Sequence, residues 1–187
     1  MKTTVGSRFG VLLCLFLCQC SDLSEKGPEP SYEGCATDEN WMTLDAALRD
    51  ASTEVHVAEA PIFLAPASAA SLDADVAPVF RFAPSRSSAG QSGGNVSCPQ
   101  YQPQHVAGTG PLHLPVVTGT IFDLHVAIAE VDVYRVLTTR QFAGIPLGTW
   151  RTWSGKTLTV TVYRSSLDKN EIVSGPFRSE SLMVSVK

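Results

Sequence analysis

Hydrophobic and polar residues alternate with a period of two in most of the segments that follow residue 53. A β-strand places successive side chains on opposite faces, so this period predicts half-buried strands. Their content of β-branched and aromatic residues agrees with that reading, and Gly, Pro, Ser and Asn separate them as turns require. The alternating segments are 54–57, 78–82, 122–128, 134–138, 157–162 and 182–186.

Six or seven such strands without a long helix predict an all-β fold, an antiparallel sandwich that covers residues 53–187. The alternation also assigns a direction to each side chain, because a slip of one residue would exchange the two faces of a strand. The residues expected to point inward are Phe80, Phe82, Leu124, Val126, Val160 and Val184. Those expected to face solvent are Arg81, Asp123, His125 and Thr161.

Between Thr37 and Ala51 the hydrophobic residues are spaced with the period of a helix. Trp41, Leu44 and Leu48 fall on one face of this segment. Thr37 or Asp38 is a suitable N-cap residue. We therefore expect one short helix within residues 21–52, in the stretch that joins the start of the chain to the sandwich.

Residues 1–20 have the pattern of a secretory signal peptide. Lys2 and Arg8 provide a positive start, and residues 9–17 form an apolar run. The run is too short for a transmembrane helix, which needs about 20 apolar residues. The segment therefore predicts export of the chain.

The end of this segment, Leu17-Cys18-Gln19-Cys20, resembles the bacterial lipoprotein box, in which an apolar residue stands three places before a lipidated cysteine. The resemblance implies that Cys20 carries a lipid and that the protein is anchored to a membrane. Gln19 departs from the small residue usual there, so cleavage before Ser21 and plain secretion remain the alternative. Residues 21–31 are polar and contain Gly and Pro, as a flexible tether would.

Two cysteines, Cys35 and Cys98, lie beyond the export segment. An exported chain meets an oxidising compartment, so one disulfide between them is expected. Two free or separately buried thiols are the alternative. The cysteine spacing does not fit a zinc site, because there is no C-x-x-C pair and no histidine nearby at ligand spacing.

The segment Val55-His56-Val57, followed by Pro61 and then by Pro78-Val79-Phe80-Arg81-Phe82, resembles the opening strands of bacterial immunoglobulin-like or fibronectin type III-like modules. The later segments are similar too, with tryptophans in a loop between two strands and a closing strand after Gly175-Pro176-Phe177. The resemblance covers residues 53–187. It implies a fold and carries no functional residues.

Composition excludes some partners. The formal net charge is -4, and no cluster of Lys and Arg provides the basic surface that nucleic-acid binding needs. Hydrophobic residues make up 44% of the chain, which is enough for a folded core. The partners that remain are a membrane, through the N-terminal lipid, and another envelope protein or a glycan.

Three candidate catalytic or metal sites are weak. Ser92 lies in a G-x-S-x-G match, but its flanks lack the strand and helix of a nucleophile elbow. The two acidic turns, at 73–75 and 168–171, resemble solvated turns more than calcium loops. The four histidines, His56, His105, His113 and His125, have no metal-binding spacing. The one metal site that they leave open is a mononuclear site built from His105, His113 and a carboxylate.

Trp150, Trp153 and Tyr134 form the remaining candidate, an aromatic platform for a sugar or a peptide. The alternative is that these three side chains belong to the core. The sequence therefore favours a non-catalytic envelope lipoprotein that needs neither cofactor nor metal. A small secreted hydrolase that uses Ser92 or a histidine-based site is the alternative.

Overall fold

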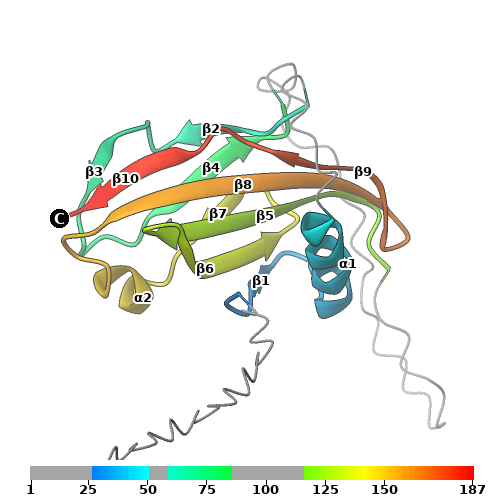
Figure 1. Cartoon of the computed structure of the whole chain (residues 1–187), viewed down its shortest axis with the longest axis horizontal. Helices are drawn as coiled ribbons and strands as arrows, with labels where there is room; N and C mark the ends of the chain where they lie inside the picture. The colour runs from blue at the N-terminus through cyan, green and yellow to red at the C-terminus, as the bar shows by residue number, and fades with distance from the viewer. Residues whose placement is uncertain (1–26, 51–58, 86–115) are drawn as a thin grey trace, which may run out of the picture.

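The computed structural model describes residues 27–50, 59–85 and 116–187, and within them the chain forms two β-sheets and two helices (Figure 1). The large sheet has the order β1–β6–β5–β8–β10–β3, and β9 also pairs with β8. Its strands are β1 (Ser31–Glu33), β3 (Ala70–Leu72), β5 (Gly119–Ile128), β6 (Val131–Thr138), β8 (Thr157–Asp168), β9 (Glu171–Arg178) and β10 (Leu182–Val186). The small sheet has the order β2–β4–β7. Its strands are β2 (Ile62–Ala65), β4 (Val79–Ala83) and β7 (Phe142–Gly144), and the helices are α1 (Asp38–Arg49) and α2 (Leu147–Arg151).

The two sheets form an open sandwich, which confirms the mostly-β fold expected from the alternation. The central strands pair antiparallel, with β5 between β6 and β8. The expectation of a purely antiparallel arrangement is wrong at two edges, because β1 pairs parallel with β6 and β10 pairs parallel with β3. In both cases a short strand from a segment distant in sequence extends the sheet at its edge.

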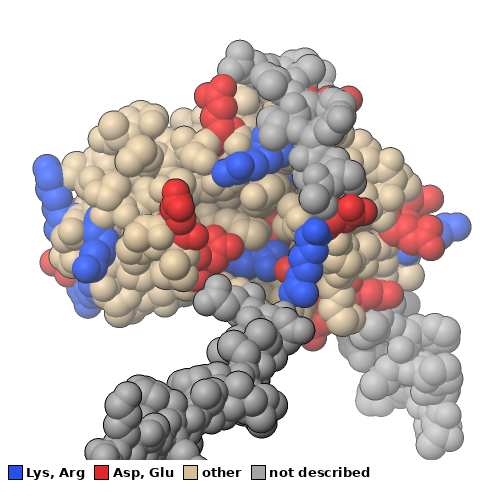
Figure 2. Space-filling model, in the orientation of Figure 1, with Lys and Arg blue, Asp and Glu red and all other residues tan. Residues whose placement is uncertain are grey.

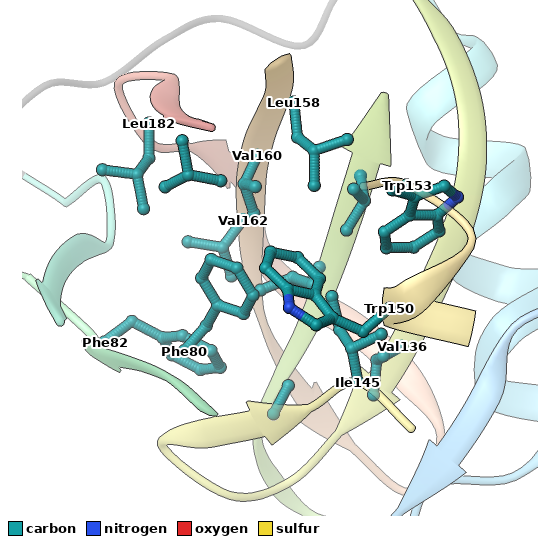
Figure 3. Packing of buried hydrophobic residues seen from close by; sticks show 14 of the residues in the cluster. Phe80, Phe82, Val136, Ile145, Trp150, Trp153, Leu158, Val160, Val162 and Leu182 are labelled. Carbon is teal, nitrogen blue, oxygen red and sulfur yellow. The ribbon is translucent and has the colours of Figure 1, made fainter. Parts of the chain in front are cut away.

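The main core lies between the two sheets. The six residues expected to point inward are all buried there, at 0–1% exposure, and Arg81 is exposed as expected. Figure 3 shows side chains from the small sheet, the large sheet and α2 pointing toward one another. The period of two therefore identified the inner face of each of these strands correctly.

The opposite face of the large sheet carries a second, smaller core beneath α1. Leu44 of the helix packs against Ile121, Leu137 and Leu167. The helix begins where the sequence predicted, because Thr37 is the N-cap of a capping box with Asn40. It does not stand apart in the tether: α1 packs on the sheet and β1 belongs to it, so the boundary expected at residue 53 does not separate them from the sandwich.

The turn between β8 and β9 helps to hold α1 in place. Lys169 and Asn170 have positive φ values of 52° and 69°, as a tight hairpin turn requires, and the hairpin expected here is confirmed. The Asn170 amide donates to Glu39 at 2.9 Å and its oxygen accepts from Asn40 at 3.0 Å. These hydrogen bonds attach the first turn of α1 to the turn between β8 and β9.

Three residues expected to face solvent are buried or nearly so. Asp123 is 1% exposed and Thr161 6% exposed, and the His125 side chain is 13% exposed. The alternation placed them correctly on the face opposite the main core. The error was to assume that this face meets water, whereas charged partners and neighbouring side chains cover these positions.

Candidate functional site

A chain of charged side chains crosses the helix-bearing face of the large sheet, and we call Asp45, Asp123, His125, Asp132 and Arg135 the Asp123 cluster. His125 and Arg135 are directly opposite each other on β5 and β6, and Asp123 shares their face two residues along β5. Asp45 reaches this face from α1. The cluster therefore joins the helix to the centre of the sheet.

Arg135 lies at the middle of the cluster. Its Nη1 donates to Asp45 at 3.0 Å and its Nη2 donates to Asp123. His125 lies between two carboxylates, with Nδ1 at 2.9 Å from Asp132 and Nε2 at 3.1 Å from Asp123. Every charged member thus has at least one partner of opposite sign, as buried ions require.

The pKa values follow from these contacts. Burial alone would lower the pKa of His125, but the carboxylates of Asp123 and Asp132 outweigh it and raise the pKa to about 9. Burial alone would raise the pKa of Asp123, whereas His125 and Arg135 lower it below the usual range. At neutral pH we therefore expect a charged imidazolium beside an ionised carboxylate.

This arrangement is suited to holding structure together and is poorly suited to catalysis. A general base needs a neutral imidazole near pH 7, whereas His125 is held in its charged form. Within the described residues no group of three metal-ligating side chains is close enough to hold an ion. Other members of the proposed sites, Ser92, His56, His105 and His113, lie outside the described residues.

The pH dependence of stability offers a test of the cluster. A histidine with its pKa raised from 6.5 to about 9 stabilises the fold fully below pH 6.5, and that contribution is lost as the pH rises through 9. The loss is at most about 3 kcal/mol. We expect urea unfolding of the wild type to show this decline, and the variant His125→Gln to lack most of it. Lys156→Gln, at an exposed cation, should keep the wild-type slope, and equal slopes for the two variants would contradict the assignment.

The three aromatic residues expected to form a platform do meet, but inside the protein. The Trp153 ring lies 6.0 Å from the Trp150 ring and 6.1 Å from the Tyr134 ring. Trp150 is fully buried and Trp153 is 7% exposed, and both belong to the main core (Figure 3). The platform hypothesis is therefore wrong in its geometry, since neither indole presents a face to solvent.

A groove that sequence reasoning missed lies between a strand of the small sheet and a corner of the large sheet. It has a volume of 760 Å³, within the range of small ligand sites. One wall is β2 with the chain around it, and the other wall is the junction between β9 and β10. The lining residues are Ala60–Leu64, Pro66–Ser68 and Arg178–Leu182.

Contacts with the core and with β8 hold the two walls of the groove in place. Phe63 of β2 packs edge-on against Phe80 of the core, with ring centroids 6.5 Å apart. At the other wall the Ser179 hydroxyl accepts from the backbone N–H of Val162 at 3.0 Å, and the Ser179 N–H donates to the Val162 carbonyl at 2.9 Å. The groove is therefore bounded by backbone that is fixed to the sandwich.

Cys35 is disulfide-bonded. Cys98, its expected partner, lies outside the described residues, and so does Cys20, so both the pairing and the lipidation remain predictions. No helix within residues 27–50, 59–85 and 116–187 combines the length and the apolar character that crossing a bilayer requires.

Comparison with known proteins adds no assignment. No family model, no curated protein and no solved structure matches the chain.

Proposed function

We propose that this chain is an exported lipoprotein of the bacterial envelope, that its folded part is a non-catalytic binding module, and that the groove between β2 and the β9–β10 junction is the binding site. The observation that carries the binding function is the groove itself. It is concave, it has apolar and polar walls, and both walls are fixed to the core. Binding sites in rigid folds commonly have these properties.

The export and anchoring parts of the proposal rest on the sequence. The positive start, the short apolar run and Cys20 support a lipid anchor, and the polar residues that follow support a tether. The immunoglobulin-like or fibronectin type III-like identity of the sandwich is part of the same proposal, supported by its two facing sheets. A Cys35–Cys98 disulfide would add a covalent link in the oxidising compartment that export implies.

The lipid anchor has a direct test. Cells that express the full chain are fed a clickable fatty acid, and we expect the wild-type protein to take up the label and Cys20→Ser to lose it. Cys18→Ser is the matched control and should keep the label, because Cys18 does not occupy the modified position of the box. Label that persists in Cys20→Ser, or none in the wild type, would favour plain secretion.

The binding function is tested by site-specific photo-crosslinking in the native envelope. The photoreactive residue p-benzoylphenylalanine replaces Leu64, a groove residue that is 53% exposed, or Val173, which is 64% exposed and lies outside the groove. We expect a discrete adduct from position 64 and none from position 173. Ser68→Trp, which places a large ring in the groove, should suppress the adduct. The same pattern from both positions would remove the groove from the proposal.

A further inference from the structure

One wall of the groove is formed by β2, an edge strand of the small sheet in the described part of the chain. β2 pairs with β4 on one side, and in the described part of the chain no strand pairs with its other side. A strand edge of this kind offers backbone N–H and C=O groups to any extended segment that lies beside it. The four residues of β2 would span roughly 13 Å, enough to pair with about four residues of an incoming strand.

The opposite wall also ends in an open strand edge. β9 pairs with β8, and within residues 27–50, 59–85 and 116–187 nothing continues the sheet beyond it. The groove therefore lies where a further strand would bridge the small and the large sheet. Pairing to a strand edge supplies affinity through the backbone, and side chains at alternate positions supply selectivity.

The side chains of the groove indicate what an incoming strand would carry. Leu64 is exposed and Ile62 is half-buried, and both line the groove, so apolar contacts are available. Arg178 is exposed at the rim and forms no ion pair with the described residues. Glu180 also lines the groove and has an interaction partner of its own.

One face of the molecule carries charges of both signs. On the face shown in Figure 2 the basic and acidic side chains are interspersed, and they do not gather into one large patch of a single sign. Arg178 is the one cation among the described residues that line the groove, and a guanidinium without an ion pair favours a carboxylate on the ligand.

We infer that the groove takes an extended polypeptide segment, which adds to the edge of β2 that lies away from β4, places an apolar side chain against Ile62 and Leu64, and presents an acidic side chain to Arg178. This inference rests on the proposed binding function and specifies its ligand class. The ligand is a strand of another protein with the pattern of an apolar residue and a nearby Asp or Glu.

The test uses the full-length protein purified in detergent and a phage-displayed library of random decapeptides. Selected peptides are synthesised with a fluorophore, and their affinity is measured by fluorescence anisotropy. We expect binders that contain an acidic residue, and at least a tenfold weaker affinity for Arg178→Glu. Exchange of the acidic residue of the peptide for Lys should restore binding to that variant. Lys156→Glu, an equal change of charge at an exposed site outside the groove, should bind as the wild type does.

Backbone methylation of the peptide tests strand addition itself. In a strand the N–H groups of alternate residues point toward the same edge. Peptides methylated at every second nitrogen in one register should therefore lose binding, and those methylated in the other register should keep it. Binding that is indifferent to the register, or a library that yields no binder dependent on Arg178, would overturn the inference.

Two further results separate this inference from the proposed function. A crosslink from Leu64 in the envelope together with the absence of any peptide binder would leave the groove as a binding site and reject the strand as its ligand. A dimer that appears with rising concentration in analytical ultracentrifugation and disappears in Leu64→Lys would assign the groove to a second copy of the chain, and it would also overturn the inference.

Discussion

Replacement of Asp123 by Asn should lower the free energy of unfolding by about 3–5 kcal/mol, because it leaves the cations of the Asp123 cluster without their buried carboxylate. Asp123 is 1% exposed, and it is the shared partner of Arg135 and His125. The Arg135 side chain is 5% exposed, so water cannot replace the lost anion well. Guanidinium unfolding at pH 7, followed by far-ultraviolet circular dichroism, measures the loss.

Asp75→Asn is the matched control for this result. Asp75 also accepts from an arginine, Arg151, at 3.0 Å, but its side chain is 76% exposed. Ion pairs at the surface contribute roughly 0–1 kcal/mol, so this variant should unfold close to the wild type. If the two variants lost equal stability, the Asp123 cluster would not be a buried structural element.

The alternation of hydrophobic residues predicted which side chains share a face, and it could not predict what covers that face. Leu124 and Val126 point into the main core as expected, and Asp123 and His125 lie together on the other face, as the same period requires. The face of a strand that carries polar residues is normally exposed to solvent. Here charged residues of the neighbouring strand β6 and Asp45 of α1 cover these positions, and periodicity within one strand carries no information about them.

The start of α1 was predictable because it depends on neighbours in the sequence. Thr37 caps the helix through Asn40, three residues away. The pairing of Arg135 with Asp45 joins residues 90 positions apart, so no local pattern reveals it. Asn170 shows the same limit: its place in a tight turn was foreseeable, whereas its hydrogen bonds to Glu39 and Asn40 across the fold were not.

The groove was missed for a related reason. Its walls are parts of β2 and of the β9–β10 junction, which lie more than one hundred residues apart along the chain. None of its residues belongs to a recognisable motif, and Leu64 and Arg178 look ordinary in their own segments. Only the order of the strands in the two sheets shows that, among the described residues, no further strand pairs with the edge of either wall.

Truncation of Trp150 to Ala should cost about 3–5 kcal/mol of unfolding free energy, the range expected for a large aromatic residue removed from a core. The sequence left open whether this residue belongs to a binding surface or to the interior. It is fully buried, and it packs against Trp153 and residues of both sheets. Its Nε1 donates to the carbonyl of Asp73 at 2.9 Å, which ties α2 to the segment after β3.

Trp150→Phe separates the two contributions, because it keeps most of the ring and removes the hydrogen bond, and it should cost only about 1–2 kcal/mol. Met183→Ala is the control for a hydrophobic residue at the surface, 53% exposed, and should change stability by about half a kcal/mol or less. The measurement is the guanidinium unfolding curve by circular dichroism, since loss of an indole alters the fluorescence signal itself. A Trp150→Ala variant as stable as Met183→Ala would mean that α2 does not close this end of the core.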